Sequence, residues 1–150
     1  AAFCKALEEV CASLAEQVVA DGEGATRIAE IKVEKAKNEK EALAVARAIS
    51  GSLLVKTALN GCDPNWGRII CAAGYSGVPV DENKMELFFG KYPAFIKGAP
   101  AKTPEKKLAA EMKKEKVEIT LVLNRGRASA SCLFCDISKD YVTINADYRS

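Results

Sequence analysis

Four short polar clusters interrupt the apolar patterns of the chain, and they hold the side chains best suited to chemistry. The clusters are Asp21-Gly22-Glu23-Gly24, Lys56-Thr57, Asp63-Pro64-Asn65-Trp66-Gly67-Arg68 and Asn145-Ala146-Asp147-Tyr148-Arg149-Ser150. Their carboxylates, amine, amides and hydroxyls can pair with a charged substrate. Each cluster also has an ordinary structural explanation: a helix stop, the exposed end of a strand, a capped turn and a frayed tail. Taken singly, therefore, the clusters do not specify a reaction.

The absence of histidine excludes several kinds of site within these 150 residues. Without an imidazole, neither a Ser-His-Asp or Cys-His nucleophilic system nor a His-containing zinc site can be built. The pair Cys132-x-x-Cys135 lies in a strand pattern, which places its side chains on opposite faces. No second pair supplies further zinc ligands. We therefore predict that the chain holds no metal ion.

Composition and charge indicate an ordinary globular segment. The 150 residues are 49% apolar, which is enough to bury a core, so we expect a single domain over residues 1–150. With 22 basic and 20 acidic residues, the net charge of +2 gives no reason to expect nucleic acid or an anionic membrane as a partner. No apolar run approaches the roughly 20 residues that span a bilayer. The expected location is the cytoplasm.

The six cysteines favour the same reducing compartment. Most of them stand among apolar residues at positions that we expect to face the core, where a free thiol behaves as a small hydrophobe. They are Cys4, Cys11, Cys62, Cys71, Cys132 and Cys135.

Hydrophobic periodicity predicts alternating helices and strands. The segments expected to be helices are residues 3–18, 38–49, 66–73, 103–114 and 139–148, and the segments expected to be strands are residues 26–36, 85–89, 92–96, 117–123 and 128–136. Turn-forming residues at 124–127 favour a hairpin between the last two strands. The predicted class is α/β (α+β), with a mixed or antiparallel sheet covered by helices.

The helix over residues 3–18 begins without a capping residue, so we expect that the chain was cut from something longer. Its apolar stripe and that of residues 38–49 should cover the sheet. A segment removed from its subunit should also leave an exposed apolar patch at its start or along a sheet edge.

Read together and in order, the polar clusters resemble those of one enzyme family. The matching stretches are residues 21–26 (Asp-Gly-Glu-Gly-Ala-Thr), 54–58 (Leu-Val-Lys-Thr-Ala), 63–69 (Asp-Pro-Asn-Trp-Gly-Arg-Ile), 135–136 (Cys-Asp) and 140–150, which ends in Ile-Asn-Ala-Asp-Tyr-Arg-Ser. The chain resembles the C-terminal part of the β subunit of ornithine acetyltransferase (glutamate N-acetyltransferase, the arginine biosynthesis bifunctional protein family). The resemblance covers essentially the whole chain.

The resemblance implies transfer of an acetyl group from N-acetylornithine to glutamate through an acetyl-threonine enzyme, without a cofactor. In the family, a precursor cleaves itself before the threonine that becomes the nucleophile. The threonines here are internal and none fits that cleavage motif, so the nucleophile and the oxyanion-hole donors are expected from other polypeptide, and this segment alone should be inactive. The implied partners are an α subunit and the remainder of the β subunit in an α2β2 assembly.

Three alternatives remain open. A bifunctional form of the family also accepts the acetyl group from acetyl-CoA. A non-catalytic structural module, or an isolated fragment, would keep the fold without the chemistry. The mitochondrial matrix or a plastid is an alternative location.

The resemblance implies that the substrate contacts are Glu23, Asn145 and Ser150. Glu23 can pair with an ammonium group, Asn145 can both donate and accept, and the Ser150 hydroxyl can bond a carboxylate or carbonyl. These three residues are expected to converge at one edge of the domain, facing a partner.

We expect a supporting role for four further residues, namely Lys56, Asp63, Asn65 and Arg68. Asp63 is expected to cap the short helix that follows, and Arg68 to lie in an ion pair or to pack on Trp66.

Two departures from the family pattern affect local packing. Leu53 stands where the family often has proline, and Cys132-Leu133-Phe134 replaces a stretch that often carries Trp-Gly.

Overall fold

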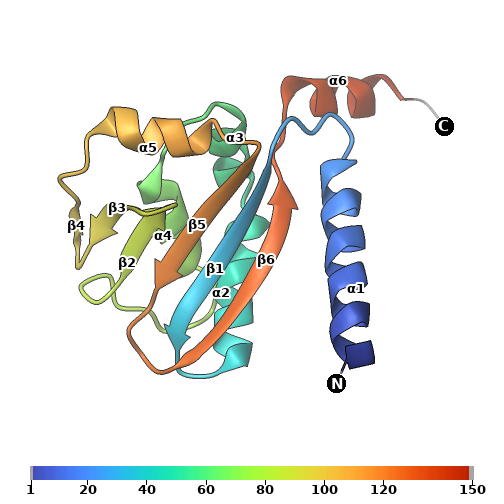
Figure 1. The fold of residues 1–150 in the computed structure, drawn as a ribbon. Coiled ribbons are helices and arrows are strands. Elements are labelled where there is room, and N and C mark those ends of the chain that lie inside the picture. Colours follow the sequence, from blue (N-terminus) through green and yellow to red (C-terminus); the bar gives the residue numbers. More distant parts are fainter. Residues whose placement is uncertain (1, 149–150) are drawn as a thin grey trace.

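A six-stranded mixed sheet forms the centre of the computed structural model, which describes residues 2–148 (Figure 1). The strands lie in the order β4-β3-β2-β5-β1-β6. Their bounds are β1 Ile28–Ala36, β2 Glu86–Phe89, β3 Tyr92–Ile96, β4 Ala99–Pro100, β5 Lys116–Val122 and β6 Ala128–Cys135. β1 and β5 are parallel and the other neighbours are antiparallel. The predicted fold class is confirmed.

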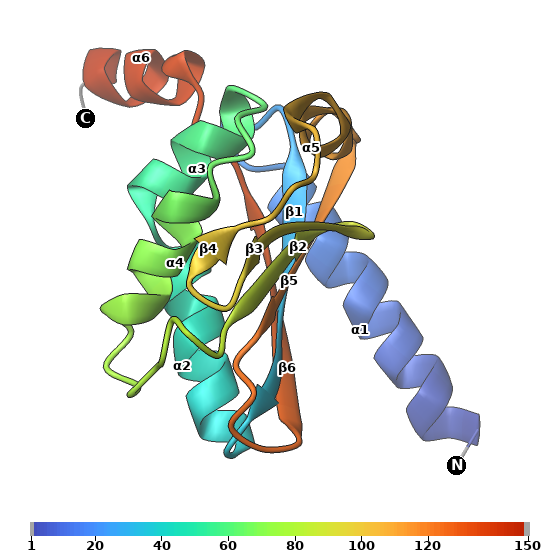
Figure 2. The same cartoon turned by 90° about the vertical axis from the view of Figure 1, so that its left-hand side faces the viewer.

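The helices lie on both sides of this sheet. Against one face lie α2 (Glu39–Ser50), α3 (Leu53–Asn60) and α4 (Trp66–Gly74) (Figure 2). The long helix α1 (Ala2–Ala20) stands off the opposite face. The short helices α5 (Glu105–Met112) and α6 (Lys139–Asp147) lie at one end of the sheet.

The core lies between the sheet and the helices that cover it, and in β1 it follows a period-two pattern. Ala29, Ile31 and Val33 are completely buried, whereas Lys32 is exposed. Apolar residues of β5 and the apolar stripe of α2 belong to the same cluster, which extends to β2, β3, α3, α4 and α5. Burying a side chain the size of Ile31 contributes about 2 kcal/mol, so this pattern fixes which face of the strand meets the helices.

The expected hairpin between the last two strands is wrong, because β1 lies between them. Ala29 pairs with Val117 of β5 in parallel register and with Phe134 of β6 in antiparallel register. The link between β5 and β6 passes over the end of β1, where the backbone N–H groups of Arg125 and Gly126 donate to the carbonyl oxygen of Lys35, at 2.7 and 2.9 Å. Inserted in this way, β1 satisfies its backbone on both edges.

Two other local expectations need correction. Lys56-Thr57 lies within α3 and is not the end of a strand; Ser52 caps this helix by accepting from the backbone N–H of Val55. Proline suits the first turn of a helix, so the position of Leu53, the first residue of α3, explains why other sequences can carry proline there. The helix expected over residues 103–114 is shorter: α5 runs from Glu105 to Met112, and Pro104 holds its cap position without a side-chain hydrogen bond.

The long helix α1 does not cover the sheet, contrary to expectation. None of its residues is buried, and Phe3 and Val18 are 77% and 75% exposed. α1 lies beside β6, and its Glu16 forms an ion pair with Lys116 at the start of β5, at 3.1 Å. Its apolar stripe is exposed, which confirms the expected exposed apolar patch at the start of the chain. The stripe consists of Phe3, Leu7, Val10, Leu14 and Val18.

The cysteines are less buried than expected. Cys4, Cys11 and Cys71 are exposed and the other three are partly buried, and all six are free thiols. The expectation fails because two of them lie on α1, which packs only lightly. Cys132 packs against the core whereas Cys135 faces Gly22 on the opposite side, as their spacing predicts.

Within residues 2–148 no single helix has the length and apolarity to cross a membrane. Only the bent pair of α2 and α3 meets that test, by length and composition alone.

Cross-linking distinguishes the observed strand order from a hairpin. Lys32 is opposite both Ser131 and Thr120, so a Lys32→Cys/Ser131→Cys pair should form a disulfide on mild oxidation. Thr120→Cys/Ser131→Cys, which a hairpin would place in direct register, should not form one, because two strand spacings of about 4.8 Å separate the residues. Peptide mass spectrometry identifies the product, and a disulfide in the second variant alone would contradict the strand order.

Candidate functional site

Glu23 and Asn145, which are far apart in the sequence, meet at one end of the sheet. Glu23 lies in the loop between α1 and β1, and Asn145 lies in α6. The Nδ2 of Asn145 donates to Oε2 of Glu23 at 2.6 Å and to the carbonyl oxygen of Tyr141 at 2.9 Å. Both side chains are exposed. The structure therefore brings two of the three expected substrate contacts together, and Ser150 lies outside the described residues.

Asp136 anchors the loop that carries Glu23. This residue follows β6, is only 3% exposed and accepts four hydrogen bonds. Its Oδ1 accepts from the backbone N–H groups of Thr26 (2.8 Å) and Arg27 (3.1 Å). Its Oδ2 accepts from the hydroxyl of Thr26 (2.6 Å) and from Nδ2 of Asn60 (2.8 Å). The loop before β1, the end of β6 and the end of α3 are thereby joined at one carboxylate.

A second attachment ties the same loop to the start of α6. The hydroxyl of Ser138 donates to the carbonyl oxygen of Gly24 at 2.6 Å and accepts from the backbone N–H of Tyr141 at 3.2 Å, which caps α6. Gly24 has φ +66°, and a Cβ there would lie 2.7 Å from the Tyr141 nitrogen. Only glycine allows this approach, so Gly22-Glu23-Gly24 is more than a helix stop.

Lys56 supports the same end of β6. Its Nζ donates to the carbonyl oxygen of Cys135 at 2.6 Å and lies 5.9 Å from the centre of the Phe134 ring. Lys56 and Asn60 stand one helical turn apart on α3, so one face of this helix contacts both Cys135 and Asp136. Direct contact of Lys56 with a substrate is not needed to explain its position.

The other expected supporting residues, Asp63, Asn65 and Arg68, lie elsewhere. Asp63 and Arg68 do not make the contacts that were expected of them. Asn65, not Asp63, caps α4 by accepting from the backbone N–H of Arg68 at 3.2 Å; Asp63 accepts from Nδ2 of Asn65 at 2.9 Å. Arg68 has no ion pair among residues 2–148 and does not pack on Trp66. Its Nη1 donates to the carbonyl oxygen of Leu54 (2.9 Å) and to the Thr57 hydroxyl (3.2 Å).

Trp66 stacks instead on Phe95, with 5.2 Å between ring centroids. The Asp63–Arg68 segment therefore ties α3, α4 and β3 together, and its hydrogen bonds within residues 2–148 include none to Glu23 or Asn145.

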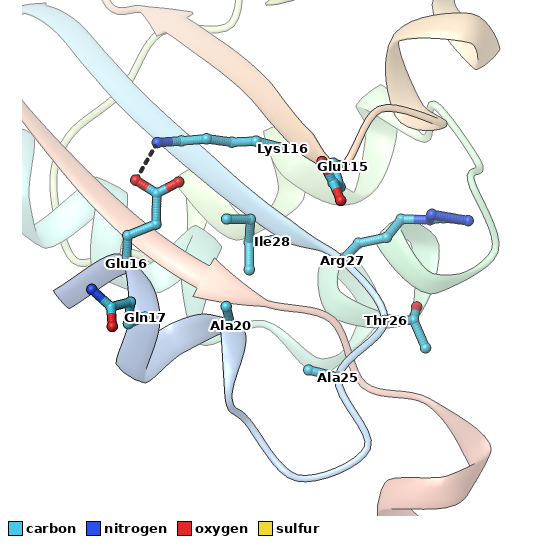
Figure 3. Close-up of a pocket in the computed structure, with 9 residues that line it drawn as sticks. All are labelled: Glu16, Gln17, Ala20, Ala25, Thr26, Arg27, Ile28, Glu115 and Lys116. Carbon is cyan, nitrogen blue, oxygen red and sulfur yellow. Dashed lines mark hydrogen bonds and ion pairs between the residues drawn. The ribbon is translucent and has the colours of Figure 1, made fainter. Parts of the chain in front are cut away.

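A hollow of about 370 Å³ lies beside the Glu23 loop, between α1 and the starts of β1 and β5 (Figure 3). In Figure 3, Lys116 reaches Glu16 across it, while the side chain of Arg27 extends away from that ion pair. The Nε of Arg27 is buried and has no hydrogen-bond partner within residues 2–148. The hollow is lined by Glu16, Gln17, Ala20, Ala25, Thr26, Arg27, Ile28, Glu115 and Lys116. The loop that carries Glu23 borders the hollow, but the Glu23 side chain does not line it.

Among residues 2–148, no group of three or more His, Cys, Asp or Glu side chains is arranged to hold a metal ion.

Comparison with known proteins identifies the family. The model of the ArgJ family matches residues 1–150. The chain belongs to the ArgJ family. It is 47% identical over 148 residues to the arginine biosynthesis bifunctional protein ArgJ of Dehalococcoides mccartyi, covering 99% of this chain and 36% of that protein. The protein of the same name from Archaeoglobus fulgidus is 45% identical over 149 residues, covering 95% of this chain and 39% of that protein. The chain thus spans less than two fifths of these relatives.

A solved structure from the ArgJ family has the same fold. The crystal structure of the arginine biosynthesis bifunctional protein argJ from Bacillus halodurans superposes with a TM-score of 0.93 at 42% identity. The match covers 97% of this chain and 69% of that one. The resemblance inferred from the polar clusters is confirmed.

Asp136 titrates in an unusual environment. Burial disfavours its charged form, but the hydrogen bonds from Thr26, Asn60 and Arg27 outweigh that effect, and the pKa of Asp136 is lowered from its ordinary value. Sequence reasoning did not single this residue out, because a carboxylate after a strand is a common surface feature. Its one signal was membership of the Cys135-Asp136 stretch within the family pattern.

This lowered pKa predicts a pH-dependent contribution to stability. A carboxylate whose pKa is lower in the folded state stabilises the fold above its unfolded pKa, about 3.9 for Asp, and loses that contribution as the pH falls towards the folded value. Asp136→Asn should therefore lower the free energy of unfolding by about 2 kcal/mol near pH 7 and by less below about pH 4. Urea unfolding of the complete protein at several pH values measures this difference.

Glu82→Gln is the control, because Glu82 is exposed and its side chain makes no hydrogen bond to the residues that the structure describes. A cost of Asp136→Asn that stays constant between pH 7 and pH 3 would show that the charge of Asp136 does not contribute.

Proposed function

We propose that the chain is part of an acetyltransferase that moves the acetyl group from N-acetylornithine to glutamate during arginine biosynthesis. The observation that carries this proposal is the contact between Glu23 and Asn145, 2.6 Å apart although 122 positions separate them in the sequence. Relatives in the ArgJ family are named arginine biosynthesis bifunctional proteins, and ornithine and glutamate both carry amines.

The hydrogen bonds of Asn145 suit the recognition of a protonated amine. Its Nδ2 donates to Glu23 and to the Tyr141 carbonyl, so the amide nitrogen is occupied and the amide oriented. Within residues 2–148, the Oδ1 of Asn145 and the second carboxylate oxygen of Glu23 take part in no hydrogen bond and can act as acceptors. An ammonium group has three donors and a positive charge, so it can bridge both. Acetylation blocks one amine of ornithine and leaves the other free to bind in this way.

The nucleophile of the proposed reaction belongs to polypeptide beyond these 150 residues. In the reaction implied by family resemblance, a threonine hydroxyl attacks the acetyl carbonyl, the amide C–N bond breaks and ornithine leaves with the proton. The amine of glutamate then attacks the acetyl ester and regenerates the threonine. We propose that this segment supplies substrate contacts, and that alone it does not turn over. Within the described chain, the hydroxyl of Thr26 is committed to Asp136 and does not act as the nucleophile.

We further propose that other polypeptide covers α1, as the remainder of the β subunit and an α subunit in an α2β2 assembly would do. The exposed apolar stripe of α1 supports this idea, since stripes of this kind mark interaction surfaces. The relatives are also more than twice as long as the chain. Their description as bifunctional favours a second activity in the complete protein, for which the family resemblance implies acetyl-CoA as donor.

The test of the proposed function is Glu23→Gln in the complete, self-cleaved protein. The substitution removes the charge that faces the ammonium while keeping the shape, so kcat/KM for acetyl transfer from N-acetylornithine to glutamate should fall about thirtyfold, equivalent to about 2 kcal/mol.

Glu82→Gln is again the matched control, since the same substitution at that exposed turn should leave kcat/KM unchanged. Equal activities of the two variants would remove Glu23 from the site.

A further inference from the structure

We propose that Asp136 is a positioning residue for the substrate amine, which it never touches. It holds the loop that carries Glu23 in register with α6, so that Glu23 and Asn145 form one acceptor group. This inference rests on the proposed function, because it assigns the part of the fold that keeps the proposed amine site intact.

Asp136 has no free acceptor capacity for a ligand. A carboxylate offers about four lone-pair positions, and all four are used: Oδ1 by two backbone N–H groups, Oδ2 by the Thr26 hydroxyl and the Asn60 amide. At 3% exposure the carboxylate is also shielded from solvent. Its role must therefore act through the groups that it binds.

Those groups connect directly to the amine site. Asp136 fixes Thr26 and Arg27, and Ser138, two residues further on, fixes Gly24. Glu23 is the neighbour of Gly24, and Asn145 is carried by the helix that Ser138 caps. The Asp136-Ile137-Ser138 segment thus holds both the loop of Glu23 and the helix of Asn145 from a single point at the end of β6.

The enzymatic consequence is a change in KM more than in kcat. If the loop loosens, Glu23 occupies its position beside Asn145 for less of the time and the amine binds more weakly. Asp136 contacts no reacting atom, so chemistry in the saturated complex is preserved. Loss of binding that is equal in the ground and transition states raises KM and leaves kcat unchanged.

The experiment compares variants of the complete, self-cleaved protein, with N-acetylornithine as the varied substrate and glutamate as acceptor. Asp136→Asn replaces the acceptor facing Thr26 and Asn60, and Thr26→Val removes the hydroxyl at almost constant volume. Each should raise KM about tenfold, with kcat within about twofold of the wild type. Thr26→Ser keeps the hydroxyl and should restore the wild-type KM. If Asp136→Asn does not fold, the Thr26 pair still tests the proposal.

Glu41→Gln is the stability control. Glu41 accepts from Nη1 of Arg125 at 3.0 Å in a partly buried ion pair at the opposite end of β1. A merely structural effect would change KM equally in this variant, whereas a positioning role leaves its KM at the wild-type value.

The outcomes separate the two proposals. If Glu23→Gln raises KM but Thr26→Val does not, the positioning role is overturned and the proposed function survives. If Glu23→Gln leaves kcat/KM unchanged, the proposed amine site itself is overturned. A fall in kcat at constant KM in the Asp136 and Thr26 variants would also contradict the positioning role.

Discussion

The hydrogen bonds of Asp136 are the interaction on which the candidate site depends. A buried carboxylate is costly unless its oxygens are satisfied, and here the donors come from the loop before β1 and from α3. Satisfying this one charge therefore brings separate parts of the chain to the end of β6. The Ser138 hydroxyl then extends the connection to Gly24 and the start of α6. These two attachments hold the loop of Glu23 and the helix of Asn145 at the same end of the sheet.

The position of β1 is the constraint beneath that arrangement. As an inner strand between β5 and β6, it holds the loop that precedes it next to the end of β6, where Asp136 emerges. Period-two alternation correctly predicted that residues around Ile31 form a strand with one buried face. Alternation cannot reveal which strands are neighbours, because it reports burial and not pairing. The turn-forming residues at 124–127 favoured a hairpin, yet the Lys35 carbonyl holds this turn across the end of β1.

The sequence singled out two residues that meet in the fold, but it did not predict the contacts around them. Glu23 and Asn145 were chosen by family resemblance, and the structure brings them into contact. Arg68 was expected in an ion pair or packed on Trp66, but a guanidinium can equally satisfy backbone carbonyls, and here it binds the Leu54 oxygen. Asp136 was missed because its four donors come from 76 or more positions away. The apolar stripe of α1 was read correctly as a helix, but sequence alone does not state which surface covers it.

The most direct test of this account is a crystal structure of the complete protein with N-acetylornithine bound. The account predicts that the free ammonium nitrogen lies about 2.7–3.2 Å from a carboxylate oxygen of Glu23, with Oδ1 of Asn145 as a second acceptor and the four hydrogen bonds of Asp136 intact. An ammonium group bound instead beside Glu16 and Gln17, with Glu23 turned away from the ligand, would contradict it.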